Sequence, residues 1–288
     1  NASQVFMDTV KFRFINQPAA QATAMAAREV DVFFNIATQT VERFQADRAY
    51  QVLIGASSGK GMLALNNRRK PLDDVRVRRA ITHAIDRERF IQQVLDGRGK
   101  AIGSHFSPTD AGYVHLAGLY PYDPKRARAL MREAGVKLPL SLTLTLPPTP
   151  YARDGAPLIV AALEAIGIHV TTEPVDWAHW LSGAFKGDFD LTLINHVEPL
   201  DYPIYTDPNY YFGYDSAEFR QLVERHAASS SAREHQVLFA QLQRKLANDA
   251  VNAWIFAPQL STVARKGLKG LWMNYPIFAH DVAALRWE

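Results

Sequence analysis

The segment with the most chemical potential lies between residues 195 and 214, where His196, Glu198 and Asp201 follow one another closely. Imidazole and carboxylate groups can act as general base and acid, and they can also bind a metal ion together. Their spacing differs from helix-borne metal motifs such as H-E-x-x-H, which favours a loop histidine satisfied by hydrogen bonds. We therefore expect no metal and no cofactor. A hydrolase that uses these three residues is the alternative function.

The same loop is rich in tyrosine. Five of the eleven tyrosines in the chain lie there. Tyrosine combines a broad apolar face with a polar tip, which suits ligands of variable side chain. We therefore predict that the loop binds a small ligand. The candidate contacts are Asn195, His196, Glu198, Asp201, Tyr202, Tyr205, Tyr210, Tyr211 and Tyr214, and a second loop at residues 104–113 adds Phe106 and Tyr113 as weaker candidates.

Several function classes are disfavoured by what the sequence lacks. It contains no phosphate-binding glycine loop. It has no cysteine, which excludes thiol catalysis and disulfide bonds. The net charge of +3 comes from dispersed basic residues, a pattern that does not favour nucleic-acid binding. No apolar run approaches the roughly 18 residues of a membrane span. We therefore predict a binding protein rather than an enzyme.

Strands and helices alternate in the part of the chain that carries the tyrosine-rich loop. Such alternation predicts βαβ units with a largely parallel sheet. In open α/β sheets, the loops beyond the carboxyl ends of the strands line ligand clefts, so the loop after residue 195 is the place to expect a ligand. The expected strands are 142–146, 168–175 and 189–195, and the expected intervening helices are 158–166 and 177–185.

Outside this region the pattern is also of mixed α/β type. Asp73, Asp86 and Asp123 each precede an apolar helical stripe and are expected to be helix N-caps. Residues 5–14 alternate between apolar and polar side chains, which predicts a strand. Two final strands are expected at 254–256 and 260–264.

Two strings resemble a known family. Residues 72–87 read LDDVRVRRAITHAIDR and residues 122–136 read YDPKRARALMREAGV. Together, in this order and separation, they resemble the hallmarks of family 5 extracellular solute-binding proteins, the peptide/nickel-binding group. Weaker matches occur at 26–32, 187–191 and 249–256.

The resemblance implies an α/β fold of the periplasmic-binding-protein type II, with two lobes joined by two chain crossings. Residues 3–66 and 252–288 would belong to lobe I, and residues 67–251 would form lobe II. The resemblance also implies a long segment before this sequence. We therefore expect the sequence to be the C-terminal part of a longer protein, with the signal peptide and most of lobe I outside it.

The implied function is the capture of a peptide or peptide-like solute between the lobes for uptake by an ABC transporter. The protein would be periplasmic and monomeric, and it would meet the membrane only through the permease subunits. In peptide-binding relatives an aspartate of this loop pairs with the α-ammonium group of the ligand, and Asp201 best matches that position. A turn aspartate before Tyr202 remains the alternative. Asn195 and His196 stand where relatives usually have a Gly-Trp step, so the ligand is expected to differ.

Overall fold

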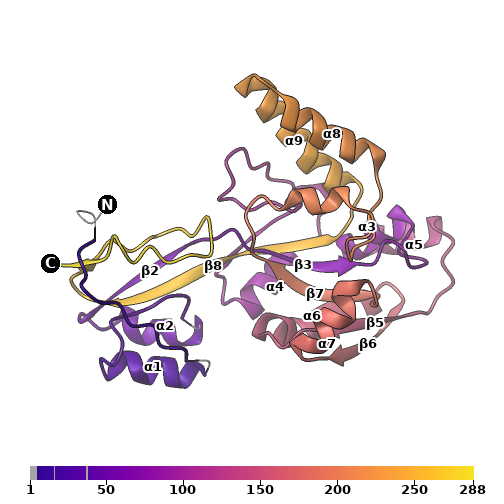
Figure 1. The fold of residues 1–288 in the computed structure, drawn as a ribbon. Coiled ribbons are helices and arrows are strands. Elements are labelled where there is room, and N and C mark those ends of the chain that lie inside the picture. Colours follow the sequence, from indigo (N-terminus) through magenta and orange to yellow (C-terminus); the bar gives the residue numbers. More distant parts are fainter. Residues whose placement is uncertain (1–4, 16, 37) are drawn as a thin grey trace.

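The computed structural model describes residues 5–15, 17–36 and 38–288. It shows two unequal parts, and one long strand, β8 (Ala253–Arg265), runs through both of them (Figure 1). Both chain ends lie in the smaller part. The smaller part contains α1 (Pro18–Ala26), β1 (Val32–Phe33), α2 (Thr38–Gln45), β2 (Tyr50–Ala56), β9 (Leu268–Lys269) and β10 (Arg286–Trp287).

The larger part carries the remaining elements. Its strands are β3 (Lys60–Leu65), β4 (Gly99–Ala101), β5 (Leu140–Leu146), β6 (Ile168–Pro174) and β7 (Leu191–His196). Its α-helices are α3 (Val75–Ala84), α4 (Arg87–Val94), α5 (Pro124–Glu133), α6 (Pro150–Glu164), α7 (Trp177–Ser182), α8 (Ala217–Ala228) and α9 (Ala232–Asn248). Short 3-10 turns occur at Ala117–Leu119, Ala184–Lys186 and Tyr202–Thr206.

The main chain crosses between the two parts twice. β2 ends at Ala56 and β3 begins at Lys60, so the first crossing is residues 57–59. β8 pairs with β3 and β4 through its first half and with β1 and β2 through its second half, which places the second crossing near Pro258. The prediction of two separate strands at 254–256 and 260–264 is wrong, because β4 pairs with Ala257 and Pro258 and keeps the strand continuous.

The sheet pairing also bears on the lobe limits expected at residues 66 and 252. β3 pairs with β7 from Lys60 to Leu65, so residues 60–65 lie in the sheet of the larger part. The first residues of β8 lie in the same sheet, because Ala253 is paired with Leu63. In this structure the two parts therefore separate at the crossings rather than at the ends of β3 and α9.

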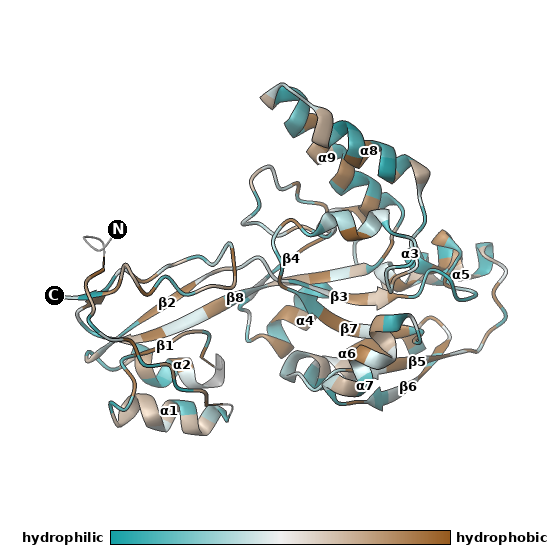
Figure 2. Ribbon diagram, in the orientation of Figure 1, coloured by the Kyte–Doolittle hydropathy of each residue, from teal (hydrophilic) through white to brown (hydrophobic). Residues whose placement is uncertain are grey.

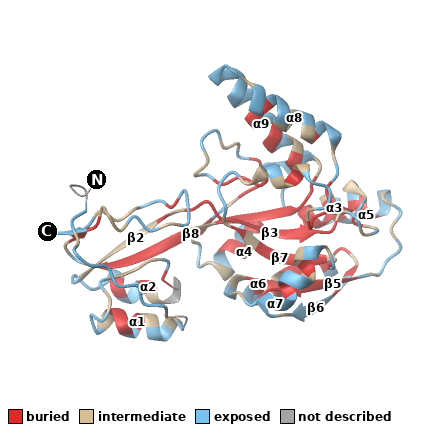
Figure 3. Ribbon diagram, viewed as in Figure 1, coloured by how far each residue is buried: buried red, intermediate tan, exposed pale blue. Residues whose placement is uncertain are grey.

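The sheet of the larger part has the strand order β8-β3-β7-β5-β6, with β5 parallel to both β6 and β7. Alternation along β3 divides the interior into two cores. Leu63 and Leu65 face a core built with α3, α4, α5 and α6, whereas Met62 and Ala64 face a second core with α7, α9 and the tyrosine-rich loop. The central strands β3 and β7 are buried and largely apolar between these layers, whereas β6 is mostly exposed (Figures 2 and 3). The predicted α/β alternation is confirmed.

The helix starts follow from local capping. The side chains of Asp86 and Asp123 each accept a backbone N–H of the first helical turn, as predicted. The cap of α3 is Asp74 rather than Asp73, because the Asp74 carboxylate accepts the N–H of Arg76 and leaves Asp73 one residue outside.

The predicted strand at residues 5–14 is wrong. This segment has no regular secondary structure, and no described strand pairs with it. Its aromatic side chains face outward, with Phe12 61% and Phe14 94% exposed. Alternation alone does not form a strand without a neighbour to accept its backbone hydrogen bonds. Among the described residues, no helix is both long and apolar enough to cross a membrane.

Candidate functional site

The tyrosine-rich loop starts where β7 ends and covers the end of the sheet beside the first chain crossing. His196, the last residue of β7, is paired with Lys60, the first residue of β3. The hydroxyl of Ser58, in the crossing itself, donates to the carbonyl of Val197 at 2.8 Å. The loop beyond the carboxyl end of β7 therefore lies directly beside the segment that joins the two parts.

The centre of this region is the carboxylate of Asp201. Its Oδ1 atom accepts hydrogen bonds from Lys60 Nζ and from His105 Nε2, each at 2.9 Å. Its Oδ2 atom accepts from His196 Nδ1 at 3.2 Å. The Lys60 side chain is only 1% exposed and that of Asp201 13%. This is a buried ion pair that joins β3, the loop at residues 104–113 and the tyrosine-rich loop.

A second layer of hydrogen bonds fixes both imidazole rings. The hydroxyl of Tyr205 lies 2.9 Å from His105 Nδ1 and accepts from Asn252 Nδ2 at 3.1 Å. The hydroxyl of Tyr211 lies 2.8 Å from His196 Nε2. If each tyrosine donates to its histidine, each neutral ring donates its other nitrogen to Asp201. All four ring nitrogens therefore have protein partners.

The electrostatics fit this assignment. Burial lowers the pKa of His105 to about 4, so its ring is neutral at pH 7. Burial raises the pKa values of Tyr205 and Tyr211 well above 10, which keeps both hydroxyls protonated as donors. Burial alone would also raise the pKa of Asp201, but the contacts from both histidines and the Lys60 charge outweigh it and hold that pKa well below its usual range. In this cluster the negative charge of the Asp201 carboxylate is therefore matched by the positive charge of the Lys60 ammonium group.

The geometry argues against a catalytic or metal-binding role. His105, His196 and Asp201 offer ligand atoms within 4.8 Å of one another, close enough for one metal ion. The ammonium group of Lys60 lies against the same carboxylate oxygen, however, and would repel a divalent cation there. A general base needs a free nitrogen within reach of a substrate, and neither ring offers one.

The candidate residues of the sequence divide into two groups by exposure. Asn195, Asp201, Tyr202, Tyr210 and Tyr113 are partly exposed and Glu198 is exposed. Phe106, Tyr205, Tyr211 and Tyr214 are buried in the second core, and His196 is 9% exposed. Direct ligand contact by the buried group stays a prediction, because their side chains present almost no surface here. The predicted ammonium contact of Asp201 is also untested, and Lys60 already occupies that carboxylate.

Three members of the cluster were not expected from the sequence. Lys60 stands at the start of an otherwise apolar strand, His105 looks like one of several dispersed histidines, and Asn252 precedes β8. The Asp201 partner of Lys60 lies 141 residues further along the chain. The one usable signal was the alternation along β3, which places Lys60 on the same side of the sheet as Met62 and Ala64.

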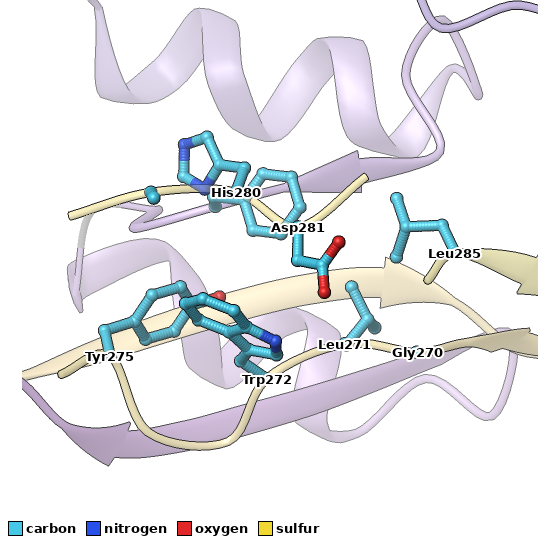
Figure 4. A pocket seen from close by; sticks show the side chains of 9 residues that line it. Gly270, Leu271, Trp272, Tyr275, His280, Asp281 and Leu285 are labelled. Atoms are coloured by element: carbon cyan, nitrogen blue, oxygen red, sulfur yellow. The ribbon is translucent and has the colours of Figure 1, made fainter. Parts of the chain in front are cut away.

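A separate hollow lies on the smaller part, next to β1 and β8. It has a volume of about 340 Å³, and its lining includes Phe33, Asn35, Leu260 and Phe278. An adjoining pocket with room for about one water is lined by Trp272 and Tyr275 on one side and by His280 and Asp281 on the other (Figure 4). These aromatic surfaces lie across the crossings from the Asp201 cluster.

The chain is similar in sequence to known binding proteins. It is 28% identical to the dipeptide-binding protein of Escherichia coli over 193 residues, which cover 65% of this chain and 36% of that protein. It is 23% identical to the oligopeptide-binding protein AppA of Bacillus subtilis over 290 residues, covering 92% of this chain and 53% of that protein. The chain thus spans between about a third and a half of these relatives.

Solved structures agree on the fold. The periplasmic binding protein DppA of Helicobacter pylori, in complex with the peptide STSA, superposes with a TM-score of 0.85 at 22% identity, covering 96% of this chain and 56% of that one. This confirms the predicted type II periplasmic-binding-protein architecture. Residues 1–218 match the family described as bacterial extracellular solute-binding proteins, family 5 Middle. With three quarters of its length matched, the chain belongs to the family 5 bacterial extracellular solute-binding proteins.

Proposed function

We propose that the protein to which this chain belongs is the substrate-binding component of an ABC transporter, and that it captures a solute between two lobes without altering it. The observation that carries the proposal is the position of the tyrosine-rich loop, which contains Asp201. It lies beside the first chain crossing and is hydrogen-bonded to it through Ser58. Inter-lobe clefts at such crossings are preferred ligand sites, and a hinge there can close over the ligand.

The proposed solute is a peptide or a peptide-like molecule. Relatives are named as dipeptide- and oligopeptide-binding proteins, which supports this class. The partly exposed aromatic surface of Tyr202 and Tyr210 offers apolar faces with polar tips to such a ligand. The hydrolase alternative gains no support, since both histidines of the cluster are fully engaged.

The remaining expectations follow from this role. We propose an extracytoplasmic protein, monomeric, whose macromolecular partners are the permease subunits. The larger part of the structure would be lobe II, and the smaller part would belong to lobe I, with the crossings at residues 57–59 and near Pro258 as hinge.

Calorimetry with the full-length protein and the solute that co-purifies with it tests the proposal. Tyr210→Ala should weaken binding about tenfold, which corresponds to about 1.4 kcal/mol for the loss of one aromatic contact. Tyr122→Ala, at a 54% exposed position next to α5, should leave the affinity unchanged. Equal affinities for wild type and Tyr210→Ala would remove the tyrosine-rich loop from the binding wall.

A further inference from the structure

The Lys60–Asp201 pair has a consequence for the class of ligand. Among the ion pairs of the described residues, this one joins side chains that are 1% and 13% exposed, whereas the carboxylates of the other Lys and Arg pairs are at least 20% exposed. A buried charge is retained only with a partner, so the pair is a built feature of the fold.

Strand geometry forces Lys60 into this place. It occupies the β3 position opposite His196, and its side chain lies on the face that carries Met62 and Ala64. Its ammonium group donates to Asp201 Oδ1 and to the backbone carbonyl of Glu198. The cation is thus held by a strand that is paired on both sides, and moving it away would leave the Asp201 carboxylate buried without it.

We infer that Lys60 is a built-in counter-ion that fills the cation position at Asp201, so that this protein takes solutes whose end at Asp201 carries no free ammonium, such as amino-blocked peptides. The inference rests on the proposed function. The carboxylate already accepts three hydrogen bonds and its charge is matched. A ligand ammonium that reached the same carboxylate would lie beside Lys60 and be repelled, whereas an uncharged amide end would not.

The test uses the full-length protein and two probes, trialanine with a free amino end and N-acetyl-trialanine, at constant ionic strength. Wild type should bind the acetylated form at least as tightly as the free form. Lys60→Met removes the internal cation and keeps an unbranched side chain out to the Cε position, so it should bind the free form about tenfold more tightly than the acetylated one, through a charge-assisted contact to Asp201.

Two results of the binding experiment would overturn the inference. One is a clear preference of wild type for the free amine that Lys60→Met leaves unchanged. The other is a wild-type preference that Glu198→Gln abolishes, which would place a ligand ammonium on the exposed Glu198 carboxylate instead.

A measurement of stability without ligand separates this inference from the proposed function. Lys60→Ala lacks the part of the lysine side chain beyond Cβ, and n-propylammonium has the structure of that missing part. Adding n-propylammonium chloride should raise the melting temperature of Lys60→Ala by several degrees over the same concentration of sodium chloride, and should not affect wild type. Absence of this rescue would overturn the inference. If neither trialanine nor N-acetyl-trialanine binds wild type while n-propylammonium stabilises Lys60→Ala, the assignment of a peptide ligand fails. The role of Lys60 as internal counter-ion of Asp201 is then still supported.

Discussion

Removing the ammonium group of Lys60 should cost the protein far more stability than removing an exposed charge. Breaking a buried ion pair by deleting one partner typically costs about 3–5 kcal/mol, because the other charge stays buried and unpaired. Asp201 keeps two histidine donors and is 13% exposed. We therefore expect Lys60→Met to lower the free energy of unfolding by about 3 kcal/mol, at the lower end of that range.

Replacing both partners should restore most of this loss. In Lys60→Met/Asp201→Asn neither charge of the Lys60–Asp201 pair remains, and the amide oxygen of Asn can still accept from His196. We expect the double variant to lie within about 1.5 kcal/mol of wild type, because neutral replacements of buried pairs are often tolerated. The matched control is Arg126→Met, whose ion pair with Glu133 is 48% exposed on both sides. It should change the stability by less than about 0.5 kcal/mol.

Urea denaturation followed by tryptophan fluorescence measures these four proteins and the single variant Asp201→Asn, since Trp180 and Trp254 are buried in the same core as the cluster. The double-mutant cycle gives the coupling energy between Lys60 and Asp201 directly. A coupling energy below about 0.5 kcal/mol, or a cost for Lys60→Met no greater than for Arg126→Met, would refute the buried-pair interpretation.

Three further predictions follow from buried contacts. Burial lowers the pKa of His105 to about 4, against about 6.5 when unfolded, so the unfolded state binds more protons between these values. Stability should therefore fall by up to about 3 kcal/mol as the pH drops from 6.5 to 4 in urea titrations, with a smaller fall for His105→Gln. Arg78 donates to four backbone carbonyls while 6% exposed, so Arg78→Lys should cost about 2 kcal/mol in thermal unfolding and Arg79→Lys about 0.5 kcal/mol or less. A Cβ on Gly61 would lie 2.3 Å from the ring of Phe256, so Gly61→Ala should cost about 2 kcal/mol, whereas Gly118→Ala, with nothing within 4 Å, should be neutral by calorimetry. Equal losses of stability in Arg78→Lys and Arg79→Lys, or in Gly61→Ala and Gly118→Ala, would contradict the packing described.

The fold was predictable where local rules decide the structure. Caps at Asp86 and Asp123 depend on a few neighbouring residues, and the alternation at residues 142–146 matches β5. Prediction failed where distant partners decide. Residues 5–14 alternate like a strand yet pair with none of the described strands, and β8 continues through Pro258 because β4 pairs with it.

In the candidate site too, features set by local order were predictable and contacts with distant residues were not. The place of the loop at the carboxyl end of β7 could be predicted from the order of strands and helices, whereas its contact with a ligand stays a prediction. The partner of Asp201 did not follow, because Lys60 lies 141 residues away and only the pairing of β3 with β7 brings them together. Burial of Tyr205 and Tyr211 likewise depends on how the loop folds onto the second core, which residue type alone does not determine.

We propose that the protein holds a small solute in an inter-lobe site and leaves it chemically intact. Mass spectrometry of the full-length protein under native conditions tests it most directly. We expect one solute per protein chain, released on denaturation and unchanged in mass after prolonged incubation with fresh protein. A protein that retains no solute from cell extract or from a peptide library, or a solute whose mass changes during incubation, would contradict it.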